Sequence, residues 1–307
     1  MIRSISLFIV LSLCILNPIK GYDFTDINSC NILTKQQSPI DIQRTNTLYY
    51  DEKYFRFLTN NYELITDKNK WTYFPEEKAV GIAPLGEEQQ DFGSFIFVRD
   101  WAMYSYRLKK IIFRTPSEHT LDGETFDAEM QLIHTVDGNY YPPGKRIDLQ
   151  GVDHLVISVL FKVTDDNNPG KSLLFQFMNL DKGLDATMSK SIKLFHIIQH
   201  QPSYLYTGSL TYPECQKSLW LIFSQYHWIG KTDFDNLNNL LSSSTGLSAN
   251  TRDIFPNIHD QEVFRNWNDK TNLIPKPTLL AYSSSSILNL SYTFLMCIVF
   301  FMLMIIF

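Results

Sequence analysis

The segment "KIIFRTPSEHTLDGETFDAEMQLIHTV", residues 110–136, decides the fold. Two runs rich in Ile, Phe, Leu and Met lie on either side of a Pro-Ser-Glu-His corner and an Asp-Gly pair. Such runs, separated by turn residues, predict neighbouring β-strands. His119, His134 and several carboxylates are the side chains of a metalloenzyme, but no two of them have the spacing that a zinc site requires. The segment therefore predicts central strands around a site, and it leaves open what that site holds.

The two ends of the 307-residue chain are set aside from the fold. Residues 1–21 are interpreted as a secretory signal peptide, because Arg3 precedes a short apolar run and a small-residue exit. Residues 287–307 form an apolar tail with no following Lys or Arg, which favours a glycolipid-anchor (GPI) signal over a single transmembrane helix. Residues 271–286 are expected to be a stalk. Either reading of the tail predicts that the body, 22–270, lies at the cell surface, on the extracellular face of the membrane.

The body has the pattern of one mostly β domain. Runs such as "SFIFV", "HLVISVLFKV" and "LWLIFSQYHWI" recur between turn signals. Short helical patterns occur around 181–198 and 233–244, where leucines follow a capping-type Asp. The net charge is −5, and the densest basic cluster, "RLKK" at 107–110, is interpreted as a solvated strand end. This composition excludes nucleic acid as a partner.

Only two cysteines belong to the body. Cys14 lies in the predicted signal peptide and Cys297 in the apolar tail, which leaves Cys30 and Cys215. In an oxidising compartment, two cysteines most simply form one disulfide, although the sequence alone does not show that they meet.

Three phrases carry a family resemblance: "QQSPIDIQ" at 36–43, "PSEHTLDGETFDAEMQLIH" at 116–134 and "YTGSLTYPEC" at 206–215. In this order and at these separations they resemble the α-carbonic anhydrases, over nearly the whole body. The resemblance implies a large, twisted, mainly antiparallel sheet of about ten strands with a few short helices and a reaction funnel on one face. It also implies a bridge between Cys30 and Cys215, since extracellular members of the family carry a bridging pair at these two places.

The same resemblance implies that the zinc site has been lost. The family holds zinc with three histidines and leaves a fourth position open for water. The matching positions here are Ile112, Arg114 and Gln131. Isoleucine has no lone pair, arginine keeps its positive charge, and an amide oxygen is a poor zinc ligand. We therefore expect no cofactor. We expect Arg114 to pair with Glu118 or Glu129, with the amide oxygen of Gln131 as a further acceptor, or to lie at the floor of a wet cavity.

Other family positions are retained in part. Thr211 matches the threonine that orients the zinc hydroxide, and Glu118 matches the glutamate that accepts its proton. Both are expected to be vestigial and to support a hydrogen-bonded corner. Leu210 and Ile133 match apolar positions of the carbon dioxide pocket, and Glu129 matches the residue that orients the third zinc histidine. The proton-shuttle histidine is replaced by Glu63 or its neighbour.

The function expected from these residues is binding or recognition at the cell surface without catalysis. The partner would be an unknown extracellular protein, a glycan or a small anion, and the C-terminal anchor would supply the membrane contact. Two alternatives stay open. One is an active carbonic anhydrase with a non-standard metal site. The other is a small-anion binder that uses Arg114 and Thr211 in the old funnel. Separately, the i, i+4 pair His196 and His200 is a minor candidate for metal binding elsewhere in the chain.

Overall fold

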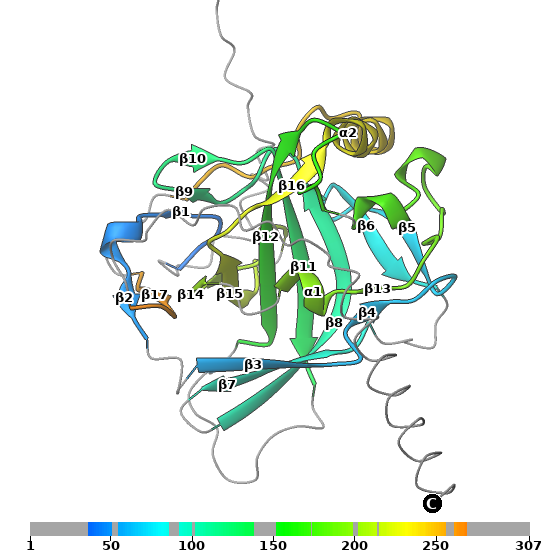
Figure 1. The fold of residues 1–307 in the computed structure, drawn as a ribbon. Coiled ribbons are helices and arrows are strands. Elements are labelled where there is room, and N and C mark those ends of the chain that lie inside the picture. Colours follow the sequence, from blue (N-terminus) through cyan, green and yellow to red (C-terminus); the bar gives the residue numbers. More distant parts are fainter. Residues whose placement is uncertain are drawn as a thin grey trace, which may run out of the picture.

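The computed structural model describes residues 36–50, 55–85, 92–99, 102–137, 152–172, 174–198, 202–213, 215–255 and 261–268 (Figure 1). The predicted signal peptide, stalk and apolar tail, together with Cys30, lie outside these residues. No helix in the described part of the chain is both long enough and apolar enough to cross a membrane.

Strands make up most of the regular secondary structure in the described chain. The strands are β1 (Asp41–Ile42), β2 (Leu48–Tyr49), β3 (Phe55–Asn60), β4 (Glu63–Leu64), β5 (Asn69–Phe74), β6 (Ala79–Pro84), β7 (Ser94–Arg99), β8 (Ala102–Arg114), β9 (Thr120–Leu121), β10 (Glu124–Thr125), β11 (Ala128–Val136), β12 (His154–Thr164), β13 (Ile192–Lys193), β14 (Ser203–Ser209), β15 (Lys217–Phe223), β16 (His227–Gly230) and β17 (Val263–Arg265). The helices are α1 (Phe195–Ile198), α2 (Lys231–Thr245) and the 3₁₀ turns η1 (Arg44–Asn46), η2 (Phe175–Phe177) and η3 (Leu180–Lys182).

One large sheet organises the molecule. Among the described residues it has 12 strands, with the central order β2-β17-β14-β15-β12-β11-β8-β6-β5, and β16, β3 and β7 attached to this path. Most pairs are antiparallel, whereas β12 runs parallel to both β15 and β16, and β17 runs parallel to β2. Figure 1 shows β8, β11 and β12 side by side at the centre. The predicted class, a mostly β fold around a large and mainly antiparallel sheet, is confirmed.

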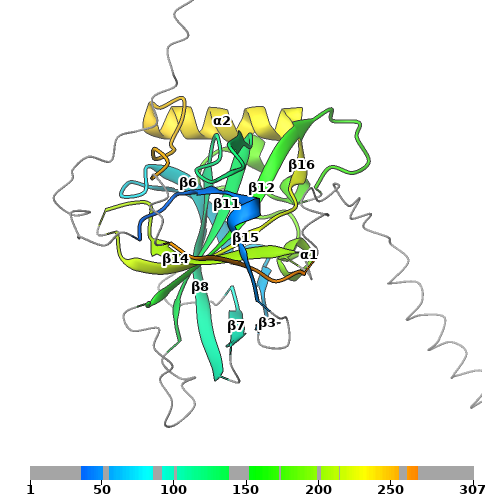
Figure 2. The ribbon, with the colours of Figure 1, turned by 90° about the vertical axis from the view of Figure 1, so that its left-hand side faces the viewer.

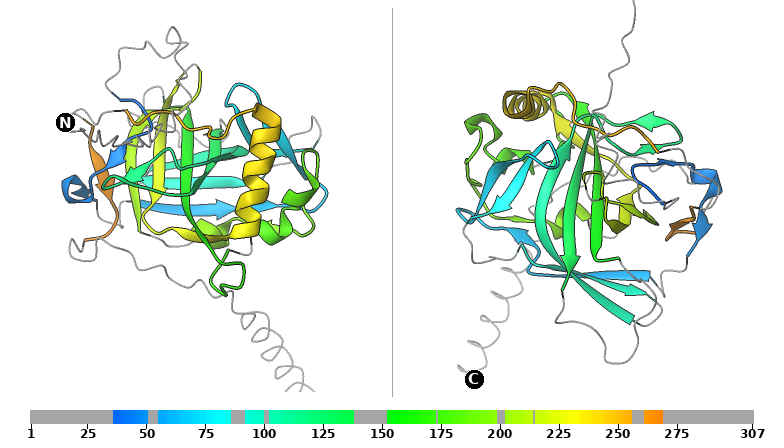
Figure 3. Two further views of the ribbon diagram at one scale, coloured as in Figure 1. Left: turned by 90° about the horizontal axis from the view of Figure 1, so that it is seen from above. Right: turned by 180° about the vertical axis from the view of Figure 1, so that it is seen from behind.

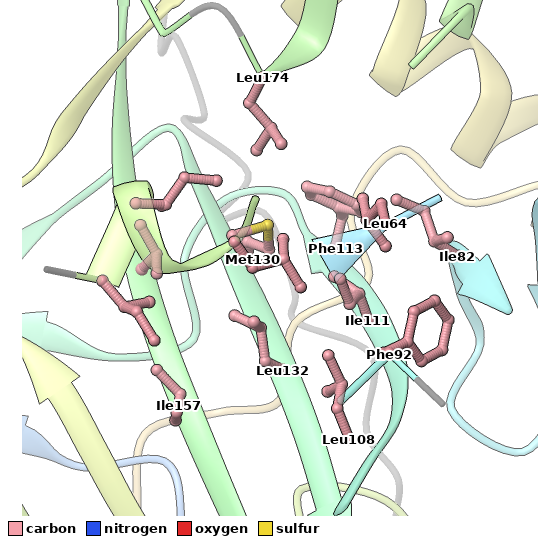
Figure 4. Close-up of a cluster of buried hydrophobic side chains, with 14 of the residues drawn as sticks. Leu64, Ile82, Phe92, Leu108, Ile111, Phe113, Met130, Leu132, Ile157 and Leu174 are labelled. Atoms are coloured by element: carbon pink, nitrogen blue, oxygen red, sulfur yellow. The ribbon is translucent and has the colours of Figure 1, made fainter. Parts of the chain in front are cut away.

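The central strands bury both of their faces, and alternation of side chains divides them between two cores. Ile111 and Phe113 of β8 join Met130 and Leu132 of β11 in the first core, which Figure 4 shows between the strands. Ile112 points to the opposite face and joins a second apolar cluster, which contains Ile133, Leu210 and Tyr212. The candidate site lies on this second face.

A β-bulge in the long strand β8 lets the apolar side chains on both sides of it face the first core. Ile133 lies opposite Lys110, but the next residue of β11, His134, lies opposite Leu108, so Lys109 is the extra residue. Without the bulge, Leu108 and Ile111 would face opposite sides of the sheet because their separation is odd. With it, both are buried in the first core.

The helix predicted at 233–244 is confirmed as α2, which packs against β6, β12 and β16 and lies across one end of the sheet (Figures 2 and 3). It ends where Gly246 takes the left-handed conformation, with φ of 72°. The helical pattern around 181–198 is wrong as a continuous helix. Gly183 and Asp185 have φ of 81° and 66°, so the chain passes through a turn and β13 before the single turn α1.

Candidate functional site

The residues predicted to occupy the site meet on the second face of the sheet. Gln131 lies directly opposite Ile112, and Glu129 lies opposite Arg114, in the antiparallel pair of β11 and β8. Because side chains alternate along each strand, these four project to the same side. The extended strands β8 and β11 thus hold the three positions expected for zinc ligands within one small region.

Arg114 is the charged centre of this region, and its side chain is 0% exposed. Its Nη1 donates to the carbonyl oxygens of Glu77 at 2.7 Å and Asn250 at 2.9 Å. Its Nη2 donates to the hydroxyl of Thr211 at 3.4 Å. Its Nε lies 3.4 Å from Oε1 of Glu118, which is also 0% exposed. The expected pairing of Arg114 with a carboxylate is therefore present, and Glu118 is the carboxylate.

Glu118 forms an ion pair with Arg114 and accepts hydrogen bonds from two further parts of the chain. Besides Arg114, the backbone N–H of Arg252 donates to Oε1 at 3.1 Å and Nε2 of Gln131 donates to Oε2 at 2.8 Å. Among the described residues, no hydrogen bond joins Thr211 to this carboxylate. Glu118 and Thr211 do share a corner, but Arg114 lies between them and links both.

Gln131 does not present its amide oxygen to Arg114, which corrects the orientation expected from sequence. Its amide nitrogen bridges two carboxylates, Glu118 at 2.8 Å and Glu129 at 3.1 Å. The physical reason is the local charge: two buried carboxylates need N–H donors, and the amide NH₂ supplies two.

Glu129 is buried and has more donors than any other carboxylate of the site. The backbone N–H groups of Glu118 and His119 each donate to Oε2 at 2.9 Å, and the hydroxyl of Ser158 donates to Oε1 at 2.8 Å. Nδ1 of His119 lies 2.9 Å from Oε1. Burial alone raises the pKa of the Glu129 carboxyl, but the charge and hydrogen bonds of His119 and the Ser158 bond outweigh it and lower the pKa to about 2.

A chain of hydrogen bonds continues from Glu129 away from the site. Since a carboxylate can only accept, Nδ1 of His119 carries the proton that Glu129 receives. Nε2 of His119 lies 2.7 Å from the hydroxyl of Tyr206, which in turn lies 2.8 Å from Oγ of Ser38. Burial raises the pKa of Tyr206 well above its usual value, so this phenol stays protonated. The chain ties "QQSPIDIQ" to the corner after β8.

Apolar side chains fill the rest of the region. Ile112, Ile133 and Leu210 are all buried in the second cluster, together with Tyr212 and Trp220. Leu210 and Ile133 were predicted to line a pocket with Glu129, and the three do lie on the same face of the sheet. Ile112 packs against this apolar set directly beside the buried charges.

Four residues of the site were not predicted from sequence: Asn250, Ser158, Glu77 and Lys110. Asn250 accepts from Arg114, and its side chain also bonds the backbone of Phe113 and Thr115. Ser158 interrupts the apolar run of β12 directly opposite Gln131. A serine in such a run is the one signal that could have indicated a buried polar partner.

The remaining predicted positions are dispersed. Glu63 lies in β4, directly opposite Lys193 in the antiparallel backbone pairing of β4 with β13. His196 lies in α1, whereas His200 falls outside the described residues. Cys215 is disulfide-bonded, and Cys30, its predicted partner, is outside the described residues. In the described part of the chain, no group of three or more His, Cys, Asp or Glu side chains is arranged to hold a metal ion.

Comparison with solved structures gives the class of fold. A crystal structure of dioscorin complexed with ascorbate aligns with a TM-score of 0.59 at 19% identity, over 79% of this chain and 90% of that chain. A carbonic anhydrase from Chlamydomonas reinhardtii in complex with acetazolamide aligns with a TM-score of 0.54 at 18% identity, over 76% and 91%. The protein has the carbonic anhydrase fold.

Sequence comparison gives the family. Residues 24–267 match the family model of the eukaryotic-type carbonic anhydrases. Carbonic anhydrase 1 of Oryctolagus cuniculus is 29% identical over 136 residues, 43% of this chain and 57% of that protein. Dioscorin DB3S of Dioscorea polystachya is 28% identical over 190 residues, 60% of this chain and 59% of that protein. The matches thus span less than three fifths of these two relatives. The chain belongs to the eukaryotic-type carbonic anhydrase family.

Proposed function

We propose that this protein is a member of the carbonic anhydrase family that does not hydrate carbon dioxide and that acts by binding a partner at the cell surface. The proposal rests on the burial and the permanent charge of Arg114. Its guanidinium is buried at a position where the family holds a dication, and it cannot deprotonate in a protein. A fixed positive charge beside a bound Zn²⁺ would repel the metal.

The neighbouring residues support the same proposal. Zinc in this family needs three imidazole nitrogens with one open position. Ile112 offers only carbon, and the amide nitrogen of Gln131 already donates to Glu118 and Glu129. The residues present at these three positions therefore do not fit a zinc ion.

The contacts of Arg114 weigh against the small-anion alternative. Its two terminal nitrogens donate to oxygen atoms within the protein, its Nε lies 3.4 Å from the carboxylate of Glu118, and its side chain is buried. An incoming carboxylate or sulfate would have to displace Glu118 or Thr211 to reach it. The proposal therefore favours recognition through the outer surface of the domain.

Zinc content measured together with hydration kinetics tests the catalytic half of the proposal. The purified ectodomain is expected to contain no stoichiometric zinc and to show no rate above the uncatalysed reaction. Zinc at one equivalent per chain, removed by a chelator together with activity, would overturn the proposal and establish the alternative of a rebuilt metal site.

A gain-of-function series tests the same point independently. The combined variant Ile112→His, Arg114→His and Gln131→His is expected to bind zinc, because the scaffold would then present three imidazoles. The single variant Arg114→His serves as the matched control and is expected not to bind. Equal zinc content in the single and triple variants would show that these positions are not the ligand positions.

The cell-surface half of the proposal rests on the composition of the two end segments. Treatment of intact cells with a phosphatidylinositol-specific phospholipase is expected to release the ectodomain if residues near Ser283–Ser286 carry a lipid. Recovery of a peptide from "CIVFFMLMIIF" in the mature, membrane-retained protein would instead establish a spanning helix.

A further inference from the structure

A second basic residue, Lys110, lies on the same face of the sheet as Arg114. Lys110 precedes Ile112 by two residues on β8 and lies opposite Ile133, so it projects to the same face. Its ammonium lies over two aromatic rings, 5.3 Å from the ring centre of Phe74 and 5.0 Å from that of Tyr212. It also forms an ion pair with the carboxylate of Glu77. The basic cluster that was interpreted as a solvated strand end thus contributes one residue to an enclosed arrangement.

The exposures of the two charged partners differ greatly. The carboxylate-bearing side chain of Glu77 is 3% exposed, whereas that of Lys110 is 23% exposed. The carbonyl of Glu77 is also held, because it accepts from Arg114. The acid is therefore the fixed part of the arrangement, beside the buried ring of Tyr212 and the half-buried ring of Phe74, and the partly exposed lysine reaches it on a flexible stem.

Aromatic faces combined with a carboxylate are the chemistry by which proteins recognise organic cations. We propose that Phe74, Tyr212 and Glu77 form a binding site for an alkylammonium group, and that Lys110 is the internal occupant with which an external ammonium competes. A primary ammonium suits the site better than a quaternary one, since Glu77 can accept N–H bonds from it. The site requires neither zinc nor its loss, so it goes beyond the proposed function.

Another lysine of the chain, Lys162, also lies over two aromatic rings and serves as an internal control. Lys162 lies over the rings of Phe126 and Tyr226, at 5.3 Å and 5.1 Å, and pairs with Glu124. The two arrangements have the same groups, but the side chain of Glu124 is 47% exposed. Because water solvates an exposed carboxylate, removal of Lys162 leaves no buried charge to attract a replacement.

Binding of n-butylammonium to the intact ectodomain tests the proposal, with n-butanol as the neutral probe of similar shape. We expect Lys110→Ala to bind n-butylammonium at least about tenfold more tightly than the unmodified protein, since the tethered competitor is gone. Lys162→Ala is expected to match the unmodified protein. Adding Glu77→Gln to Lys110→Ala is expected to abolish the gain. Equal affinity in Lys110→Ala and Lys162→Ala would overturn the proposal.

Lys110→Ala leaves Glu77 buried without its lysine, so this variant is also examined by refolding. We expect n-butylammonium to raise its refolded yield or its melting temperature, and n-butanol at the same concentration to have a smaller effect. Equal rescue by the two probes would show that the space is merely apolar, and it would contradict an ammonium site.

Discussion

Arg114 and Glu118 form a buried ion pair, in which each side chain supplies the opposite charge that the other lacks in its remaining contacts. Replacement of Arg114 by Ala removes the ion-pair partner of Glu118 and the hydrogen-bond donor of Thr211 and two carbonyl oxygens. Breaking a buried pair from one side destabilises by about 3–5 kcal/mol, because the remaining charge stays desolvated. Urea unfolding of Arg114→Ala is expected to show a loss of this size.

The exposed pair of Lys231 and Asp235 on α2 provides the comparison. Its side chains are 59% and 49% exposed, so Lys231→Ala is expected to change the free energy of unfolding by less than about 1 kcal/mol. A loss in Arg114→Ala no larger than that in Lys231→Ala would mean that Arg114 is not what stabilises Glu118.

His134 makes the stability of the domain depend on pH. It lies in the first core, its Nε2 is 2.7 Å from the hydroxyl of Tyr62, and its Nδ1 is 3.0 Å from the carbonyl of Leu155. Burial lowers its pKa from 6.5 to about 3. The unfolded chain therefore binds a proton between these values that the folded chain does not, so stability falls as pH drops from 6.5 toward 3.

The loss from His134 at pH 4.5 relative to pH 7 is expected to be about 2–3 kcal/mol. Urea midpoints at the two pH values measure it. The variant His134→Gln removes the titrating group, so its midpoint should depend less on pH over the same interval. Parallel pH dependences for the two proteins would contradict this assignment to His134.

At the scale of elements, β6 and β8 approach each other closely at Gly81. This glycine lies opposite Ile112, and a Cβ placed on it would lie 2.0 Å from the carbonyl oxygen of Ile111. Backbone cannot yield as a flexible side chain can, so Gly81→Ala must separate the strands. We expect a loss of at least about 3 kcal/mol, at the upper end of overpacking effects.

Gly246, at the end of α2, is the matched control for Gly81. It has φ of 72°, and an added Cβ meets nothing within 4 Å. Gly246→Ala should therefore lose only the conformational term, about 1–2 kcal/mol. Thermal unfolding of the two alanine variants distinguishes a steric clash from backbone strain. A smaller effect at Gly81 would show that the strand contact is softer than its geometry indicates.

Elements differed in how far they could be predicted. The helix α2 was predictable because its leucines recur at helical spacing and a glycine ends it. The interval 181–198 also has a helical pattern, but two residues with positive φ, Gly183 and Asp185, and the strand β13 divide it. The bulge at Lys109 could not be predicted, since "RLKK" alternates equally well in either register.

At the scale of the whole molecule, the predicted bridge between Cys30 and Cys215 would close a loop of about 185 residues. In the chain-entropy model such a loop contributes about 5 kcal/mol by restricting the unfolded chain. Mass spectrometry of peptides from the non-reduced protein is expected to find Cys215 linked to Cys30, and Cys215→Ser should lower the melting temperature. A linkage of Cys215 to any other cysteine would contradict the prediction.

The sequence by itself determined the family, the class of fold and the identities of the residues at the site. Three short phrases, in their order along the body, determined the family and with it the class of fold. The residue types at the site, such as Ile112 and Arg114, are read directly from the sequence. Strand periodicity also determined that 112 and 114 share one face of their strand and that 129 and 131 share one face of theirs, since a period of two leaves no other choice within an unbroken strand. That the two pairs lie on the same side of the sheet follows from the register of β8 and β11, which the structure supplies.

Only the tertiary structure decided which groups satisfy the buried charges. Besides Glu118, which follows β8, Arg114 finds its partners in the turn before β6, after β14 and at Asn250, all of them far from it in the chain. Gln131 likewise turns its amide nitrogen toward two carboxylates, and Lys110 contacts Phe74, Tyr212 and Glu77. Hydrogen bonds and ion pairs act over about 3–4 Å, so a partner is determined by where distant segments pack, and no local pattern encodes that distance.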